Sequence, residues 1–233
     1  MKKIISAMLL LLMLAAVAYA TTDLRVTAGY TTFAMNDVNN FLNSVGGATT
    51  VTNGYEIAAD LLCPIPNVPK LSIGPRVEYL GCNNGSASNS ATSVSIKQYM
   101  IPLMVGGRYI FTNNDRLSLS GNLFVGVGLG YASIDVAGVS SSYTGSSFNM
   151  DASAEGSYKL SDSVNIILDL GYRLADVGSM SAGGYGSGGG SPSGGITYAP
   201  RKVGTINTTT GSSSISYDFS GMFINIGACF KFK

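Results

Sequence analysis

Apolar and polar side chains alternate residue by residue over long stretches of this chain. In residues 148–160 every second position is apolar or small, from Phe148 to Leu160, while the positions between them carry polar groups such as Asp151 and Glu155. Successive side chains of a β-strand point to opposite faces, so this pattern predicts strands with one apolar and one polar face. Eight such runs occur, at residues 23–34, 55–63, 70–81, 94–111, 117–133, 148–160, 164–175 and 217–232.

The connections between these runs alternate in length. Short links at 64–69, 112–116 and 161–163 separate long ones at 35–54, 82–93, 134–147 and 176–216. An antiparallel up-and-down meander with tight turns at one end and long loops at the other has this layout, which is that of a transmembrane β-barrel. The sequence therefore predicts an all-β, eight-stranded barrel. The segment 196–216 leaves two alternatives open, a hairpin outside the barrel or a fifth hairpin that makes ten strands.

Composition excludes several classes of function. The 233 residues include no His, and their formal net charge is +1. Near-neutral charge argues against a nucleic-acid partner. Without His the chain cannot carry a Ser-His-Asp triad or a His-based zinc site, and it contains no Cys-x-x-Cys motif. We therefore expect no enzyme activity, no catalytic residues, no cofactor and no bound metal.

The first twenty residues have the pattern of a signal peptide. Lys2 and Lys3 precede an apolar stretch that ends in Ala18-Tyr19-Ala20, which fits the small-x-small rule for signal peptidase. The stretch is shorter than a membrane-spanning helix requires, which disfavours the alternative of an N-terminal anchor. We predict cleavage after Ala20 and a single barrel domain over residues 21–233.

Aromatic residues distinguish a membrane barrel from a soluble one, because rings with polar tips gather where a bilayer meets water. Among the residues on the apolar face of the runs, seven aromatic ones lie at the ends that the long loops connect: Tyr30, Tyr55, Tyr79, Tyr99, Tyr131, Phe148 and Tyr172. Five more lie at the turn ends: Tyr109, Phe111, Tyr158, Phe230 and Phe232. These two belts favour apolar side chains that face lipid. A soluble secreted binding barrel remains the alternative.

The charged residues lie on the opposite face of the runs, which points into the barrel. Its members are Arg25, Glu56, Asp60, Lys70, Arg76, Glu78, Arg108, Asp151, Glu155, Lys159, Asp169, Arg173 and Lys231, a nearly neutral set. Eight strands leave a lumen that side chains fill, so we expect these groups to pair. If the turn at 161–163 sets the register, Asp151 lies opposite Arg173, and Glu155 lies opposite Asp169. Two adjacent carboxylates repel each other, so we expect Arg76 or Arg108 to reach across to them.

Two further features carry predictions. Cys63, Cys82 and Cys229 lie too far apart in this topology to pair, so we expect three free thiols. In the first long loop, Val38, Phe41, Leu42 and Val45 recur at helical spacing. They predict a short amphipathic helix that packs as a lid on the barrel rim, with contact to a hydrophobic ligand or lipid as the alternative.

Two short motifs resemble a known family. The segment from Asp218 to Gly227, followed by Phe230-Lys231-Phe232-Lys233, resembles the closing strand of the small outer-membrane β-barrels of the OmpA, OmpX and OmpW types. Tyr99-Met100-Ile101-Pro102-Leu103 with Gly107-Arg108-Tyr109 resembles their fourth strand. The resemblance implies a Gram-negative-type outer membrane, contact with its lipid, and insertion machinery that reads the last strand. Such members include structural barrels, adhesins and channels.

The expected function is therefore non-enzymatic, with a surface or structural role in the outer membrane. A narrow passive channel for small hydrophobic molecules or ions is the alternative. The sequence specifies no extracellular partner.

Overall fold

The computed structural model describes residues 22–177, 180–182, 205–208, 211–214 and 216–232. The predicted signal peptide and its cleavage after Ala20 lie outside these ranges and stay predictions. The Gly-rich part of the last long connection also lies outside these ranges.

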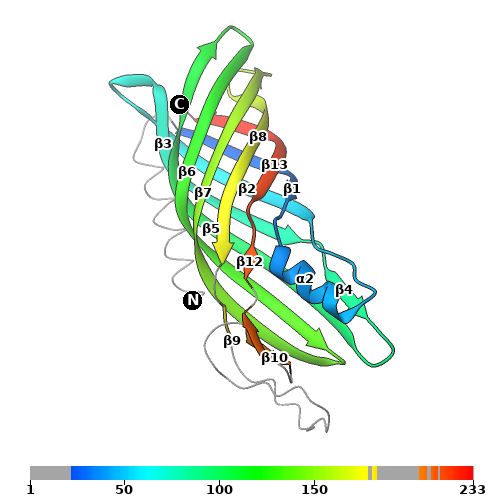
Figure 1. Ribbon diagram of the computed structural model, residues 1–233. Helices are drawn as coiled ribbons and strands as arrows, with labels where there is room; N and C mark the ends of the chain where they lie inside the picture. Colours follow the sequence, from blue (N-terminus) through cyan, green and yellow to red (C-terminus); the bar gives the residue numbers. More distant parts are fainter. Residues whose placement is uncertain (1–21, 178–179, 183–204, 209–210, 215, 233) are drawn as a thin grey trace.

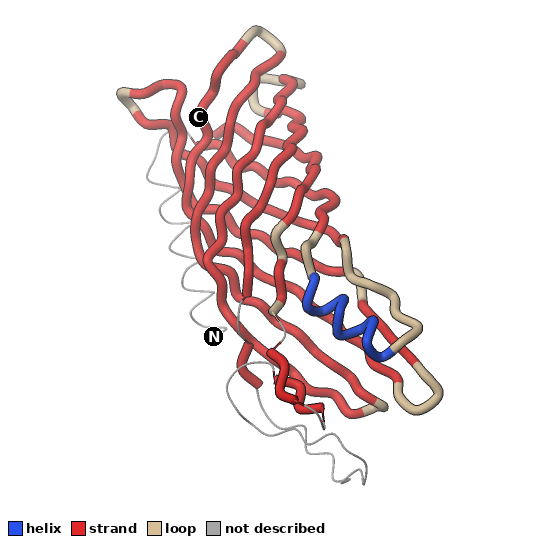
Figure 2. The backbone as a smooth tube through the Cα atoms, viewed as in Figure 1, coloured by secondary structure: helices blue, strands red, loops and turns tan. Residues whose placement is uncertain are grey.

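Eight long strands form a closed antiparallel ring (Figures 1 and 2). In chain order they are β1 (Thr22–Thr32), β2 (Asn53–Ile65), β3 (Val68–Cys82), β5 (Ser93–Asn113), β6 (Leu117–Val136), β7 (Val139–Lys159), β8 (Val164–Val177) and β13 (Gly221–Phe232). Each pairs with the next, and β13 closes the ring on β1, where Thr22 lies opposite Phe232. The predicted eight-stranded barrel is confirmed.

Smaller elements gather at one end of the barrel. They are α2 (Asn36–Val45), β4 (Gly85–Ser88), β9 (Met180–Ala182), β10 (Thr205–Thr208), β11 (Gly211–Ser214) and β12 (Tyr217–Asp218). Strands β10 and β11 pair only with each other, as a hairpin outside the ring. We call this the loop end; the turn end carries the short links and the C-terminus (Figure 1).

One predicted loop is wrong. Residues 134–147 are not a long connection, because β6 runs to Val136, β7 starts at Val139, and Ala137-Gly138 forms the whole turn. The reason is that the apolar phase changes face here. Ile134 and Tyr143 point inward and are buried, while serines occupy the outward positions, so the alternation of the rest of these strands is no longer visible.

The tight turn between β6 and β7 makes a testable prediction. Ala137 has φ of 51° and Gly138 has φ of 84°, the combination that a type I′ hairpin turn requires and that Asn-Gly satisfies best. We expect Ala137→Asn to stabilise the protein by about 1 kcal/mol, since the left-handed conformation penalises alanine. Urea unfolding followed by tyrosine fluorescence measures this.

Gly138→Ala provides the opposite control. A Cβ at Gly138 meets no atom within 4 Å, so any loss comes from the backbone conformation alone, and we expect about 1 kcal/mol. Equal stability of all three proteins would contradict the assigned turn.

The two faces of the barrel differ as the alternation predicts. Around the middle of the ring, outward side chains are apolar and exposed, with Val105 at 65% and Ile226 at 64%. Inward, Arg25, Glu56 and Arg173 are 0% exposed. A soluble barrel requires the reverse arrangement, so that alternative is wrong.

Toward the loop end the polarity of the faces inverts. On β5, Ile101 and Val105 face outward below Tyr99, whereas beyond it Lys97 faces outward and Ile96 is buried inside. The buried apolar residues form one cluster, the loop-end plug: Phe33, Met35, Val38, Leu42, Val51, Leu80, Ala87, Val94, Ile96, Met100, Ala132, Ile134, Tyr143, Ala175, Val177, Met180, Tyr217 and Phe219. The sequence analysis did not anticipate this apolar interior.

Helix α2 contributes to the plug, as predicted. Its residues Val38 and Leu42 are buried, and Phe41 and Val45 pack partly buried against the same cluster. The four residues that defined the helical spacing thus face the barrel mouth, which confirms the predicted lid.

Candidate functional site: a buried charge network

Ten charged side chains point into the barrel from six strands. The members are Arg25 on β1, Glu56 and Asp60 on β2, Arg76 and Glu78 on β3, Arg108 on β5, Asp151 and Glu155 on β7, and Asp169 and Arg173 on β8; all are 7% exposed or less. Period-two alternation alone places them on one face, and the closed ring brings them together. Charges this deeply buried need close partners of opposite sign.

Arg173 is the centre of one group. Its Nη2 lies 2.7 Å from Glu56 Oε2 and 2.9 Å from Glu78 Oε2, and its Nε lies 3.1 Å from Asp151 Oδ1. Its guanidinium carbon lies 5.3 Å from the ring centroid of Phe223. One arginine therefore joins carboxylates from β2, β3 and β7.

Arg76 shares the same carboxylates. It forms a close ion pair with Glu78, and its Nη2 lies 3.4 Å from Glu56 Oε1. Its Nε lies 3.5 Å from Asp60 Oδ1, and its guanidinium carbon lies 4.9 Å from the centroid of Phe124. Arg76 thus links the group around Arg173 to the group around Arg25.

Arg25 holds the second group. Its Nη1 lies 2.7 Å from Asp60 Oδ2, it pairs closely with Glu155, and its Nη2 lies 3.5 Å from Asp169 Oδ2. Arg25 thus lies within ion-pair distance of three carboxylates from β2, β7 and β8.

The predicted strand register is correct. Asp151 lies opposite Arg173 and Glu155 lies opposite Asp169. The predicted partner of the two carboxylates is only partly correct: Arg108 Nη1 lies 3.9 Å from Glu155 Oε1, but Arg25 provides the close contact. Arg76 pairs instead with four other carboxylates, those of Glu56, Asp60, Glu78 and Asp151.

The near-neutral balance expected of the interior is wrong. The three lysines of the predicted set lie at the turn end: Lys70 and Lys159 are exposed and Lys231 is half-buried. The buried set therefore holds four arginines against six carboxylates. Asp23, which the sequence analysis missed, adds a seventh carboxylate by pairing closely with Arg108. Its position two residues before Arg25, on the same phase, was the available signal.

Neutral polar groups complete the network. Asn225 Nδ2 donates to Glu56 Oε1 at 2.8 Å, Ser120 Oγ donates to Glu155 Oε1 at 3.4 Å, and Asn122 Nδ2 lies 3.5 Å from Asp169 Oδ1. Hydrogen bonds to buried carboxylates strengthen in a low-dielectric interior. Sequence reasoning missed these residues because Asn and Ser are equally common on exposed strands.

A polar cavity opens at the turn end and stops at the network. It has a volume of about 430 Å³, and its wall includes Asn165, Lys231 and Ser118, with Arg108 and Glu155 also lining it. The cavity therefore connects the turn end with the part of the network around Arg25.

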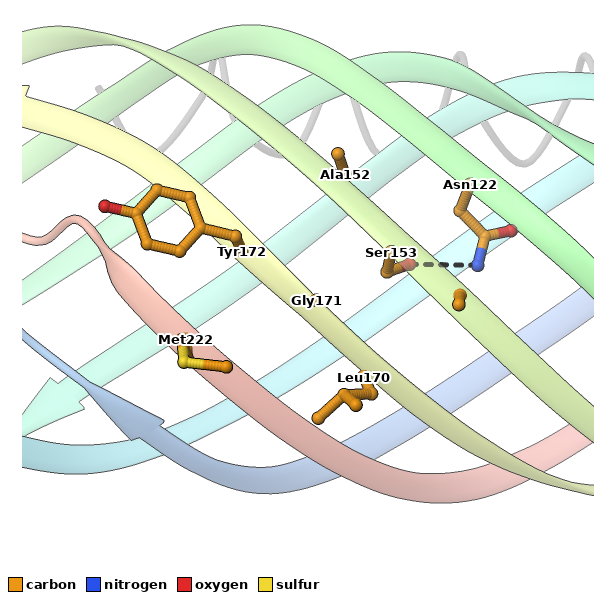
Figure 3. A pocket seen from close by; sticks show the side chains of 8 residues that line it. Asn122, Ala152, Ser153, Leu170, Gly171, Tyr172 and Met222 are labelled. Atoms are coloured by element: carbon orange, nitrogen blue, oxygen red, sulfur yellow. Dashed lines mark hydrogen bonds between the residues drawn. The ribbon is translucent and has the colours of Figure 1, made fainter.

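A second depression lies on the outer wall, where Ala152, Ala154 and Gly171 are small (Figure 3). Leu170, Tyr172 and Met222 flank it, and the hydrogen bond from Asn122 Nδ2 to Ser153 Oγ, at 3.1 Å, lies beneath. It is shallow and apolar, as a lipid-facing surface is.

The predicted belt residues face outward. Tyr30, Tyr55, Tyr99, Tyr109, Tyr158, Tyr172, Phe230 and Phe232 are 37–55% exposed, and Tyr79 and Tyr131 are half-buried. The last two are covered because they stack on neighbouring rings, as the centroid distance of 4.8 Å between Tyr99 and Tyr131 shows. Rings on the outer wall near both ends suit the two interfaces of a bilayer.

The cysteines and the acidic residues were the remaining candidates for a site. Cys63, Cys82 and Cys229 are free thiols, as predicted. Within the described ranges, no group of three or more Cys, Asp or Glu residues is arranged to hold a metal ion. No helix in these ranges has the length and apolar character that crossing a bilayer requires.

A closed ring with an apolar outer wall, aromatic belts and an ionised interior defines an integral membrane β-barrel. The family comparison identifies it further. A model of the outer membrane protein beta-barrel domain family matches residues 4–232, so the chain belongs to this family and is an outer-membrane protein. Reading of β13 by the insertion machinery stays a prediction.

Three solved structures are similar to this chain at low sequence identity. A major outer membrane protein from Thermus thermophilus matches with a TM-score of 0.52 and 10% identity, over 91% of this chain and 99% of that one. The attachment invasion locus protein Ail of Yersinia pestis gives 0.42 and 12%, over 92% and 99%. The outer membrane protease OmpT of Escherichia coli gives 0.43 and 7%, over 91% and 96%. No curated protein matches the sequence.

Proposed function

We propose that this protein is a closed, non-conducting and non-enzymatic barrel that presents its loop end at the cell surface. The observation that carries the proposal is the filling of the interior at two successive levels. The charge network occupies the middle of the barrel, and the loop-end plug closes its mouth.

The plug is held in place by specific contacts. Asn39 of α2 donates from Nδ2 to the carbonyl of Val51 at 2.8 Å, and its Oδ1 accepts from the Val51 backbone N–H at 2.7 Å. Asp37 accepts from Ser216 Oγ at 2.9 Å. Met35, Leu42 and Met100 are 0% exposed. Opening the mouth therefore requires unpacking a hydrophobic core as well as moving a loop.

A surface role is supported by the outer face of the loop-end sheet. On β7, the outward residues Ser140, Ser142, Thr144 and Ser146 are all exposed. They extend the barrel wall beyond the aromatic belt with small hydroxyl groups and little charge. Such a face is suited to contact with the surroundings of the cell, and no residue pattern specifies the partner.

A non-enzymatic role is supported by how the buried acids are used. Asp60, Asp151 and Glu155 lie against arginines, so these carboxylates serve as ion-pair partners inside the barrel. The sequence has no His to activate a serine. The protease matched above shares this fold, so the proposal rests on the residues and not on the architecture.

Single-channel recording in planar bilayers tests the proposal against a passive channel. We expect the folded protein to show no discrete conductance steps, because both levels of filling exclude a continuous water path. A porin reconstituted in parallel controls for insertion, and heat-modifiable gel migration controls for folding. Reproducible steps from the folded protein would favour the channel and overturn the closed barrel.

A further inference from the structure

The buried charges of the network do not balance. Within the described ranges, four arginines face six carboxylates, all 7% exposed or less, and Asp23 adds a seventh acid at the edge of the network. Ionised groups at this depth carry a large desolvation cost unless each has a close partner of opposite sign. Full ionisation would therefore leave at least two buried negative charges without compensation. An interior that binds a proton removes part of this excess.

Asp169 is the buried acid with the weakest contact to a cation. Its ion-pair partner is Arg25, whose Nη2 lies 3.5 Å from Asp169 Oδ2, and the same nitrogen pairs closely with Glu155. The other five buried carboxylates each have an arginine nitrogen at 3.1 Å or less. Among the acids of the network, Asp169 is therefore the one that gains least from being ionised.

Asp169 also lies beside another acid. Glu155 of β7 is directly opposite it on one side, and the neutral Asn225 of β13 is directly opposite it on the other. Two adjacent carboxylates repel each other, which favours a proton on one of them. Glu155 already has a close partner in Arg25, so a proton on Asp169 relieves the repulsion without breaking that ion pair.

The charged groups across the lumen do not compensate Asp169. Arg76 of β3 pairs with four other acids. Arg108 of β5 pairs closely with Asp23 of β1, and Asp60 of β2 adds a negative charge next to Arg25. This part of the network therefore holds two arginines, Arg25 and Arg108, against four acids, which are Asp23, Asp60, Glu155 and Asp169.

Two buried amide oxygens beside Asp169 lack a hydrogen-bond donor. Asn122 is 5% exposed and its Nδ2 lies 3.5 Å from Asp169 Oδ1, but its Oδ1 has no partner among the described residues. Asn225 is 1% exposed, and its Oδ1 has no such partner either. A carboxylate only accepts hydrogen bonds, whereas a carboxylic acid has an O–H to donate. A proton on Asp169 supplies a donor where this part of the interior needs one.

The polar cavity at the turn end gives this group access to protons. Its wall includes Ser120 and Glu155, and Glu155 is the neighbour of Asp169. The short turns of an outer-membrane barrel lie on the periplasmic side. A proton can therefore exchange between Asp169 and the periplasm by way of Glu155 and the cavity, without passing the loop-end plug.

We propose that the charge network is a proton-binding site that holds a proton on Asp169 at neutral pH, in equilibrium with the periplasmic side. An aspartate of the unfolded chain is ionised at this pH. Folding therefore takes up a proton, and the stability of the barrel decreases as the periplasmic pH rises. The proposal does not depend on whether the barrel conducts.

The pH dependence of unfolding tests this site. The sequence contains no His, so no side chain with ordinary titration behaviour changes its charge between about pH 5 and 8. The mature chain is folded into phosphatidylcholine vesicles and unfolded with urea across this window, with gel migration as the measure of the folded fraction. We expect the ratio of folded to unfolded protein to decrease by up to about tenfold per pH unit.

Matched Asp→Asn substitutions locate the proton. Asparagine resembles a neutral aspartic acid in shape, so Asp169→Asn is expected to abolish the pH dependence and to equal or exceed the wild-type stability at the alkaline end of the window. Asp151→Asn makes the same change in the group around Arg173, where the ion pair is 3.1 Å long. It is expected to lower the stability at every pH and to retain the pH dependence. Heat-modifiable migration shows whether each variant folds.

Infrared spectroscopy in an ester-free detergent detects the proton directly, because the C=O stretch of a neutral carboxylic acid is separate from that of a carboxylate. We expect this band at neutral pH in the wild-type protein and in Asp151→Asn, but not in Asp169→Asn. Absence of the band or of the pH dependence in the wild-type protein would show an ionised network and overturn the proposal. A band that persists in folded Asp169→Asn would place the proton on another acid and contradict the assignment.

Discussion

Arg173→Ala is expected to lower the free energy of unfolding by about 3–5 kcal/mol. The substitution leaves Glu56, Glu78 and Asp151 buried around the site of a cation that all three contact within 3.1 Å. Arg76 is the remaining cation of that group, and it already contacts these acids as well as Asp60. Urea unfolding in lipid vesicles, monitored by gel migration, measures the change.

Lys159→Ala is the matched control for this loss. Lys159 also pairs with a carboxylate, Asp162 at 2.7 Å, but their side chains are 43% and 79% exposed. Exposed ion pairs contribute little, so we expect a change below about 1 kcal/mol. If the two substitutions cost the same, the interior is hydrated and the network does not fill the barrel.

Val125→Arg is expected to destabilise the protein by about 2–4 kcal/mol in a bilayer. Val125 faces outward in the middle of β6 and lies between Val105 of β5 and Met150 of β7. An arginine there would place its charge in hydrocarbon. The free energy of unfolding in vesicles is again the quantity to measure.

Ser133→Arg makes the same change eight residues further along the same outward face. Ser133 lies beyond Tyr131, where the outer wall is polar, so the expected cost is about 0–1 kcal/mol. A large cost at both positions would mean that the bilayer extends over the loop-end sheet, and no cost at Val125 would mean that this wall does not face lipid.

Much of the fold follows from local sequence because period-two alternation records which face each residue occupies. The inward direction of Glu56, Asp151 and Arg173 could be predicted in this way, and so could the pairing of Asp151 with Arg173, since the short turn at 161–163 fixes the register. Each of these inferences needs only one strand or one hairpin.

What could not be predicted depends on contacts across the barrel. Arg25 rather than Arg76 pairs closely with Glu155 because the closed ring brings β1 across from β7, which no local pattern encodes. The hairpin turn at Ala137-Gly138 could not be predicted from the sequence for a related reason. Beyond the belt, apolar residues turn inward around α2, and the outward phase no longer reads as apolar.

Spin-label accessibility along β5 tests the central claim most directly, which is that the apolar face is turned to lipid below Tyr99 and inward beyond it. Labels at Ile101, Leu103 and Val105 are predicted to collide mainly with oxygen, which partitions into hydrocarbon. A label at Lys97 is predicted to collide mainly with a water-soluble nickel complex, and labels at Ile96 and Met104 with neither. Oxygen access at Met104 together with nickel access at Val105 would show the reverse orientation and contradict the account.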